Sequence, residues 1–266
     1  MGAGGGLVAL ILIAIVACVG GQYFVDGDGN GGFDDLVFDR APPEVPAGTA
    51  NEPVDRPVDS ARDFVGRISG DIQRLWAREF RAAGHEYLPT RIVLFTRSTR
   101  SGCGPASAAA GPFYCTLDRK IYADLGFFNV LSQRFGAPGD FPQAYVIAHE
   151  YGHHVQNLLG INRRVRQQTM LSNQNELSIR LELQADCFAG VWGHSACPQG
   201  ILEEGDIEEG LDAAEAVGDD RIQRATTGRV DPETFNHGTS ERRRTWFLRG
   251  LESGDPNGCD TISGGA

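Results

Sequence analysis

One segment, DFPQAYVIAHEYGHHVQNLLG at residues 140–160, constrains the fold of this chain more than any other feature. Asp140 can cap the free amides of a first helical turn, and Gly160 suits the end of the helix. His149 and His153 lie on one face, because residues at i and i+4 are neighbours on a helix. A neighbouring apolar stripe can pack against a core: Ala144, Ala148, Tyr151 and Val155. The segment therefore predicts a packed helix that directs two histidines into a cleft.

The residues from His149 to His153, HEYGH, match the H-E-x-x-H pattern. Two imidazoles one turn apart can reach a single zinc ion, and Glu150 between them can act as the general base for an attacking water. A chance match in a chain with six histidines is on the order of one in a hundred. Capping or core histidines are the alternative interpretation. His154 points away from the other two, because each residue turns a helix by about 100°, and is expected to be a packed or surface residue.

A catalytic zinc needs a third protein ligand and an open position for water. The segment NELSIRLELQADCFAGVWG, residues 175–193, predicts a second long helix that carries Glu182 and Asp186 on one face. Glu182 is the expected third ligand. Asp186 is expected to accept the second N–H of a ligand imidazole, that of His149 first, because metal-bound histidines usually donate it to a carboxylate. Glu176 is the alternative ligand, and a solvated carboxylate pair is the alternative interpretation.

The order of patterns along the chain predicts an α+β fold. An apolar pattern of helical spacing starts near residue 58 and is followed by β-type runs and then by further helices. Turn residues separate the runs, which predict a small antiparallel sheet: 91–96, 111–115 and 120–124. The acidic stretch 203–220 predicts one solvated amphipathic helix.

The N-terminal part differs in composition from the rest. Residues 7–25 carry no charge, and their length suits a spanning helix. We expect residues 1–25 to anchor the chain in a membrane, with a cleaved signal peptide as the alternative. Residues 26–57 are rich in Gly, Pro and Asp and predict a flexible linker. The acidic stretch after the apolar segment favours a domain at 58–262 outside the cytoplasm, and a net charge of −11 disfavours nucleic acid.

Cysteines outside the apolar segment predict disulfides, because cysteines in an oxidising compartment tend to pair. Cys103 and Cys115 flank a short loop that can bring them together. Cys187 and Cys197 would lie about 15 Å apart on one helix and cannot pair. Cys187 with Cys259 is the preferred pair, with Cys197 left over. The alternative is that all five are reduced and buried.

Several strings resemble the bacterial putative neutral zinc metallopeptidase family. They are HEYGHH, RLELQADCFAGVWGH, GDDRIQ, NHGTSERRRTWFLRG and ESGDPNGCDT, together with SGCG, GPFYC and DLGFF. The resemblance covers roughly residues 58–262. It implies a single-pass membrane protein with a zincin-like domain outside the cytoplasm and one zinc per chain. The E-x-x-x-D pattern is similar to the gluzincin arrangement, in which the glutamate is the third ligand.

Two residues near the C-terminus are further candidates. His237 precedes a predicted helix start at Thr239 and Ser240 and is the candidate donor to the oxyanion of the reaction. A structural cap or core histidine is the alternative. Arg243 resembles an arginine near the end of related gluzincins and is a candidate oxyanion or substrate contact.

These patterns favour a zinc endopeptidase that acts on protein or peptide substrates, because a purely structural zinc has no need of Glu150. The alternatives are a catalytically inactive zinc-binding module that serves as a binding or assembly partner, and a zinc hydrolase that acts on cell-wall peptide.

Overall fold

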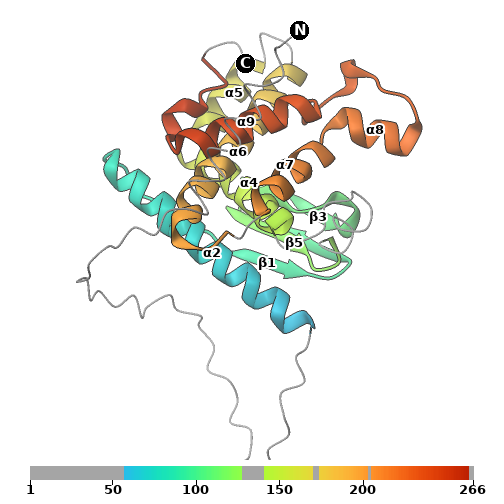
Figure 1. Ribbon diagram of the computed structural model, residues 1–266. Helices are drawn as coiled ribbons and strands as arrows, with labels where there is room; N and C mark the ends of the chain where they lie inside the picture. Colours follow the sequence, from blue (N-terminus) through green and yellow to red (C-terminus); the bar gives the residue numbers. More distant parts are fainter. Residues whose placement is uncertain (1–56, 128–140, 170–173, 203–204, 264–266) are drawn as a thin grey trace, which may run out of the picture.

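The computed structural model describes residues 57–127, 141–169, 174–202 and 205–263 (Figure 1). In these ranges two small sheets precede a mostly helical part, which confirms the α+β class. The predicted anchor at 1–25, and all but the last residue of the predicted linker at 26–57, lie outside the described residues. None of the helices described here is long and apolar enough to cross a membrane.

The described elements are, in chain order, α2 (Pro57–Ala82), β1 (Ile92–Phe95), β2 (Ser98–Ser101), β3 (Gly104–Ser107), β4 (Phe113–Cys115), β5 (Lys120–Asp124), α4 (Phe141–Leu158), α5 (Ile161–Thr169), α6 (Gln174–Ala196), α7 (Asp206–Ala216), α8 (Asp219–Thr227) and α9 (Ser240–Ser253), with three short 3-10 helices between them and a fourth after α9.

The larger sheet has the strand order β1-β5-β4 and is mixed, which corrects the prediction of an antiparallel sheet. β4 and β5 are joined by a short turn and pair antiparallel, with Tyr114 opposite Ile121. β1 pairs with β5 in parallel, with Ile92 opposite Ile121. The β2–β3 hairpin and β4 lie between β1 and β5 in the sequence, so the chain has room to cross over before β5 enters the centre of the sheet.

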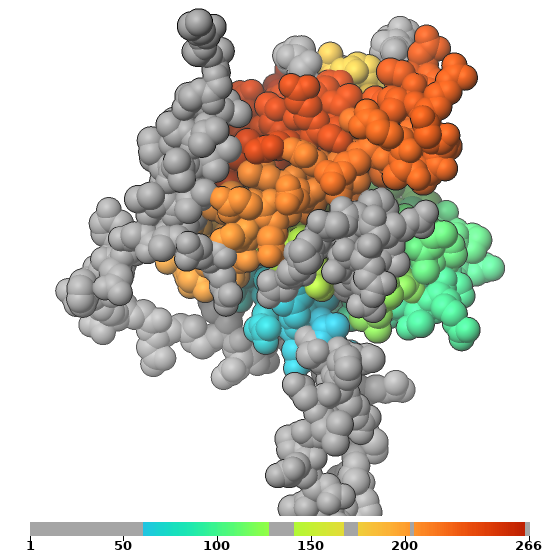
Figure 2. Space-filling view, turned by 45° about the vertical axis from the view of Figure 1, so that its right-hand side comes forward, coloured from blue at the N-terminus to red at the C-terminus, as the bar shows by residue number. Residues whose placement is uncertain are grey.

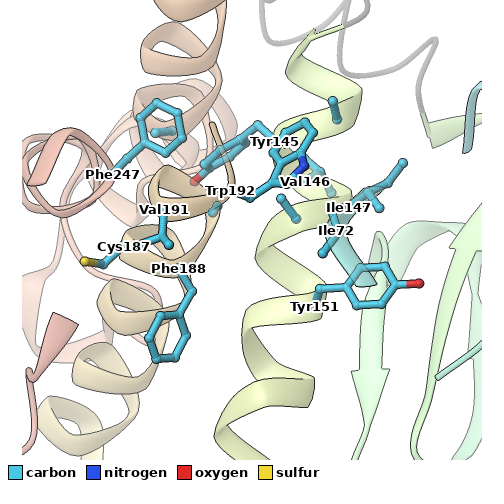
Figure 3. Packing of buried hydrophobic residues seen from close by; sticks show 14 of the residues in the cluster. Ile72, Tyr145, Val146, Ile147, Tyr151, Cys187, Phe188, Val191, Trp192 and Phe247 are labelled. Carbon is cyan, nitrogen blue, oxygen red and sulfur yellow. The ribbon is translucent and has the colours of Figure 1, made fainter. Parts of the chain in front are cut away.

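The core lies where α4 and α6 pack against each other and against α2 and α9. Figure 3 shows Tyr145 and Trp192 between α4 and α6, with Phe247 of α9 close by. The ring of Tyr145 meets Phe247 edge-on at 5.3 Å between centroids. Trp192 is fully buried and donates a hydrogen bond from its indole nitrogen to Asp71 of α2 at 2.8 Å. The indole therefore joins two helices while its polar atom stays satisfied.

Glycines allow the helices to approach closely. A Cβ atom on Gly152 of α4 would lie 2.9 Å from the Cα of Ala185 on α6. Added Cβ atoms on Gly190 of α6 and Gly250 of α9 would clash with the backbone carbonyls of Phe247 and Cys187, respectively. α6 is therefore held against both α4 and α9 by backbone contact, and a side chain at these glycines would separate the helices.

Two predicted disulfides are present. Cys103 bonds to Cys115 at the end of β4, and Cys187 of α6 bonds to Cys259. Cys197, predicted to be left over, is not free in the structure, which corrects that expectation.

The acidic stretch 203–220 forms α7 and the start of α8 rather than one helix. Ile207, Leu211 and Ala214 face the core as predicted. Gly218, with an extended backbone, separates the two helices. In the space-filling view the orange and red C-terminal helices occupy the upper part of the molecule, and the orange part adjoins the green strands below it (Figure 2).

Candidate metal centre

The candidate centre lies where α4 crosses α6. His149, Glu150 and His153 belong to α4, and Glu182 and Asp186 belong to α6. Gly152 lies between Glu150 and His153 on α4, and its missing side chain lets Ala185 of α6 come into contact. The tight crossing places the carboxylates of one helix against the imidazoles of the other.

His149, His153 and Glu182 present one metal-ligand atom each, and these atoms lie within 4.8 Å of one another. Nε2 of His149 lies 3.2 Å from Oε2 of Glu182, and Nε2 of His153 lies 3.4 Å from Oε1. Both imidazoles therefore face the same carboxylate. Two nitrogens and one carboxylate oxygen are a common donor set of catalytic zinc sites, so the residues fit this metal.

The charges of the group reinforce one another. Burial alone would lower the pKa of His149, but the carboxylates of Asp186 and Glu182 outweigh it and raise the pKa to about 10. Burial alone would raise the pKa of Glu182, whereas His153 and His149 hold it well below its usual range. A metal ion competes with protons for the same imidazole nitrogens, so its affinity must increase with pH.

Asp186 lies behind His149 and is fully buried. Its Oδ1 lies 2.8 Å from Nδ1 of His149 and accepts a hydrogen bond from the Tyr145 hydroxyl at 2.6 Å. Arg243 donates to both oxygens, from Nε at 2.9 Å and from Nη2 at 2.8 Å. A buried cation therefore balances the charge of the Asp186 carboxylate. Because this carboxylate contacts Nδ1 of His149, Nε2 of the same ring is left to face Glu182.

Arg243 itself is 3% exposed and donates to Tyr145, to the carbonyl of Val217 and to Asp186. Part of it reaches the lining of the cleft. These contacts favour a role for Arg243 in holding Asp186 in place, rather than the predicted role as an oxyanion or substrate contact.

His153 is held in place by the side-chain amide of Gln156, which is itself fixed by the backbone carbonyl of Leu181. Its Nδ1 lies 2.9 Å from Oε1 of Gln156, and Nε2 of Gln156 donates to the carbonyl of Leu181 at 2.7 Å. Since the Gln156 oxygen accepts, it selects the tautomer of His153 that leaves Nε2 free to face Glu182.

Glu150 lines the same cleft as the three candidate ligands and is 7% exposed. The cleft has a volume of about 570 Å³. On its other sides lie β4, with Phe113 and Tyr114, and His237 after α8. A substrate in this cleft would meet Glu150 and the candidate ligands together.

His237 is fixed by Asp219, the first residue of α8. Its Nδ1 lies 3.1 Å from Oδ1 of Asp219, whose Oδ2 accepts hydrogen bonds from the backbone amides of Asn236, His237 and Gly238. The hydrogen bond with Asp219 raises the pKa of His237. With Nδ1 engaged, the ring can offer Nε2 to the cleft.

The alternative ligand Glu176 and the histidine not expected to bind metal, His154, both have other partners. Glu176, the alternative ligand, pairs with Arg180 and Arg242 at 3.2 and 3.1 Å. His154 is fully buried, with Nδ1 at 3.0 Å from the Tyr114 hydroxyl and Nε2 at 2.7 Å from the Leu88 carbonyl. It is a packed residue, as the helical rotation indicates.

Sequence reasoning missed Tyr145, Gln156 and Asp219. Tyr145 and Gln156 carry a local signal, because they lie one turn before His149 and three residues after His153. Asp219 has no local sequence signal that links it to His237. Its contacts with three backbone amides depend on how the loop after α8 returns to the start of that helix.

Fold and site together define an α+β protein with a two-histidine, one-glutamate candidate metal centre on crossed helices. The chain belongs to the family described as "Putative neutral zinc metallopeptidase", whose model matches residues 1–262. Uncharacterized protein YpfJ of Escherichia coli K12 is 45% identical over 255 residues, which cover 95% of this chain and 86% of the relative. Uncharacterized protein Rv2575 of Mycobacterium tuberculosis H37Rv is 48% identical over 188 residues, which cover 66% of this chain and 64% of the relative. Among solved structures none matches the chain.

Proposed function

We propose that the chain is a zinc-dependent endopeptidase with one zinc per chain. The observation that carries this proposal is the His149, His153 and Glu182 group, whose ligand atoms lie within 4.8 Å of one another beside Glu150. A structural site has no use for an additional carboxylate in a substrate-sized cleft. Membership of a metallopeptidase family supports the same reaction.

A zinc ion held by His149, His153 and Glu182 would polarise the scissile carbonyl and make water acidic enough to attack near neutral pH. Glu150 accepts the proton that the attacking water loses and delivers it to the leaving amine. Burial in the cleft keeps Glu150 beside the reacting atoms.

The surrounding residues orient this chemistry. Asp186 fixes the tautomer and ring orientation of His149, and Gln156 does the same for His153. His237 donates from Nε2 to the oxyanion that develops on the substrate carbonyl, since Asp219 occupies its Nδ1. Arg243 keeps Asp186 ionised and in place.

The substrate that fits best is an extended peptide. β4 is at the edge of its sheet, and among the described strands only β5 pairs with it. Phe113 and Tyr114 of this strand line the cleft. An extended chain can add to such an edge through main-chain hydrogen bonds, which suits cleavage within peptides.

We further propose that residues 1–25 anchor the chain in the cell membrane as a single span, with the catalytic domain outside the cytoplasm. The uncharged run at 7–25 has the composition and length of a spanning segment. Two disulfides, Cys103–Cys115 and Cys187–Cys259, support an oxidising compartment.

The experiment compares wild type with Glu150→Gln, using Glu208→Gln, an exposed position on α7, as the control. Unfolded casein and cell-wall peptide are the substrates, and zinc content is measured in parallel. We expect Glu150→Gln to keep zinc and lose hydrolysis, because only the proton acceptor is removed. Equal hydrolysis by wild type and Glu150→Gln would exclude Glu150 as the base. Zinc binding without wild-type hydrolysis of either substrate would favour the inactive binding module.

A further inference from the structure

A series of hydrogen bonds links the candidate ligand His153 to the C-terminal segment of the protein. Gln156 of α4 contacts Nδ1 of His153, and its Nε2 donates to Oε1 of Gln184 on α6 at 3.2 Å. Nε2 of Gln184 donates in turn to the backbone carbonyl of Cys259 at 2.8 Å. Gln156 and Gln184 are 0% and 4% exposed. Because both amides are buried, bulk water does not replace a hydrogen bond that this series loses.

Two backbone carbonyls fix the orientation of both side-chain amides. A carbonyl oxygen can only accept, so the Cys259 carbonyl selects the NH2 end of the Gln184 amide and leaves its oxygen to face Gln156. The Leu181 carbonyl also accepts from Nε2 of Gln156, so the oxygen of this amide faces His153. The hydrogen of a neutral His153 ring then lies on Nδ1, and the lone pair of Nε2 is available to a metal. A Gln156 amide turned the other way would favour the tautomer that carries hydrogen on Nε2.

A disulfide holds the Cys259 carbonyl in place. Cys259 bonds to Cys187 of α6, and both residues are fully buried. Gln184 lies three residues before Cys187 on the same helix, so the disulfide keeps the accepting carbonyl beside the helix that carries the donor. Asp186, the partner of His149, directly precedes Cys187. One stretch of α6 therefore supports both candidate ligand histidines.

We infer that Gln184 is a positioning residue for the metal ligand His153 and that it acts through Gln156. Gln184 is not among the described residues that line the cleft, so its effect on a metal passes through the neighbouring amide. This inference rests on the proposed zinc centre, because the tautomer of His153 matters there for metal binding.

The test is a double-mutant cycle in the full chain. Gln184→Met keeps the length of the side chain and removes both of its hydrogen bonds, and Gln156→Met does the same one step nearer to His153. Competition with a calibrated chelator measures the zinc affinity of wild type, of both single variants and of the double variant. The visible absorption of the cobalt-loaded proteins reports the geometry of the ligands. Urea unfolding of the metal-free proteins measures the loss of stability separately.

Thr261→Val is the matched control. Thr261 is fully buried in the same C-terminal segment, and its hydroxyl donates to the carbonyl of Arg180 on α6 at 2.6 Å. Valine is close to threonine in shape and removes this hydrogen bond, which is not part of the series that leads to His153. The control should lower stability, as Gln184→Met does, and leave zinc affinity and the cobalt spectrum unchanged.

Gln184→Met should lower zinc affinity by about two- to tenfold, the range that one neutral hydrogen bond supplies, and should alter the cobalt spectrum. Gln156→Met removes the direct partner of His153 and should lower the affinity by about 10- to 100-fold. The double variant should lose no more than Gln156→Met alone, because Gln184 then has no amide left to orient. Gln184→Asn, too short to span both partners, should also lower the affinity and replaces Gln184→Met if that variant does not fold.

Wild-type affinity in Gln184→Met, an equal loss in Thr261→Val, or additive losses in the double variant would overturn the positioning role. His153→Ala reports on the proposed function separately. Full retention of zinc in His153→Ala would remove the proposed centre and this inference with it. Loss of zinc in His153→Ala, together with wild-type affinity in Gln184→Met, would remove the inference alone.

Discussion

Nδ1 of His149 lies 2.8 Å from Oδ1 of Asp186, and this contact joins α4 to α6 at the candidate metal centre. The same carboxylate accepts two hydrogen bonds from Arg243. Asp186 thus keeps its charge inside the core and fixes the ring of His149. Arg243, Asp186 and the candidate metal ligand His149 form one hydrogen-bonded unit, which spans α4, α6 and α9.

Asp186→Asn should lower zinc affinity by about 10- to 100-fold, the usual effect of removing a partner of a ligand histidine. The amide no longer selects the tautomer of His149 as strongly, and it leaves Arg243 buried without a counter-charge. Competition with a calibrated chelator measures the affinity. Asp212→Asn, at an exposed position on α7, is the control and should bind zinc like wild type. An Asp186→Asn protein that folds and holds zinc at wild-type affinity would refute this role.

Gly152→Ala should destabilise the protein by about 1–3 kcal/mol, because the new methyl group meets the backbone of Ala185 and forces α4 and α6 apart. Urea unfolding measures the change, and zinc affinity should fall with it. Gly66→Ala on α2 is the matched control, since nothing lies within 4 Å of its added Cβ. It should be neutral or stabilising by up to about 1 kcal/mol. Equal effects of the two substitutions would show that the α4–α6 contact is not limiting.

The helices of the site could be predicted because their signals are local. A spacing of four residues places His149 and His153 on one face of their helix, and Glu182 and Asp186 on one face of theirs, whatever surrounds them. That the two pairs meet follows from the chemistry of a metal that needs a third ligand. The close crossing of α4 and α6 depends on Gly152. The need for a glycine at this position becomes clear only in the structure, where Ala185 of α6 packs against it.

Pairing in the sheet could not be predicted in the same way. The run at 91–96 has the composition of a strand, but composition does not state that β5 rather than β4 will lie beside it. The contacts of Asp219 with the loop at His237 are equally long-range. Contacts between residues far apart in the sequence could not be predicted, whereas the positions of residues that share a helical face could.

The pair of His237 and Asp219 should give stability a defined pH dependence. The hydrogen bond with Asp219 raises the pKa of His237, so this contribution is complete below about pH 6.5 and is lost as the pH rises through the raised value. Burial alone would raise the pKa of Asp219, but the hydrogen bonds from His237 hold it low. Its contribution is therefore present above about pH 3.9 and is lost as the pH falls through the lowered value.

The difference in unfolding free energy between wild type and His237→Gln should accordingly be largest between about pH 4 and 6.5. It should stay below about 1 kcal/mol, because 52% of the His237 side chain is exposed and water screens the pair. Chemical unfolding at a series of pH values measures it. A difference that grows above neutral pH would contradict the assigned direction.

The proposed zinc centre is tested most directly by the anomalous diffraction of zinc in crystals of the metal-loaded protein. We expect one strong peak per chain, about 2.0–2.2 Å from Nε2 of His149, Nε2 of His153 and a carboxylate oxygen of Glu182. Asp186 should remain within hydrogen-bonding distance of Nδ1 of His149. A peak ligated by Glu176, or a peak that lacks Glu182 among its ligands, would contradict it.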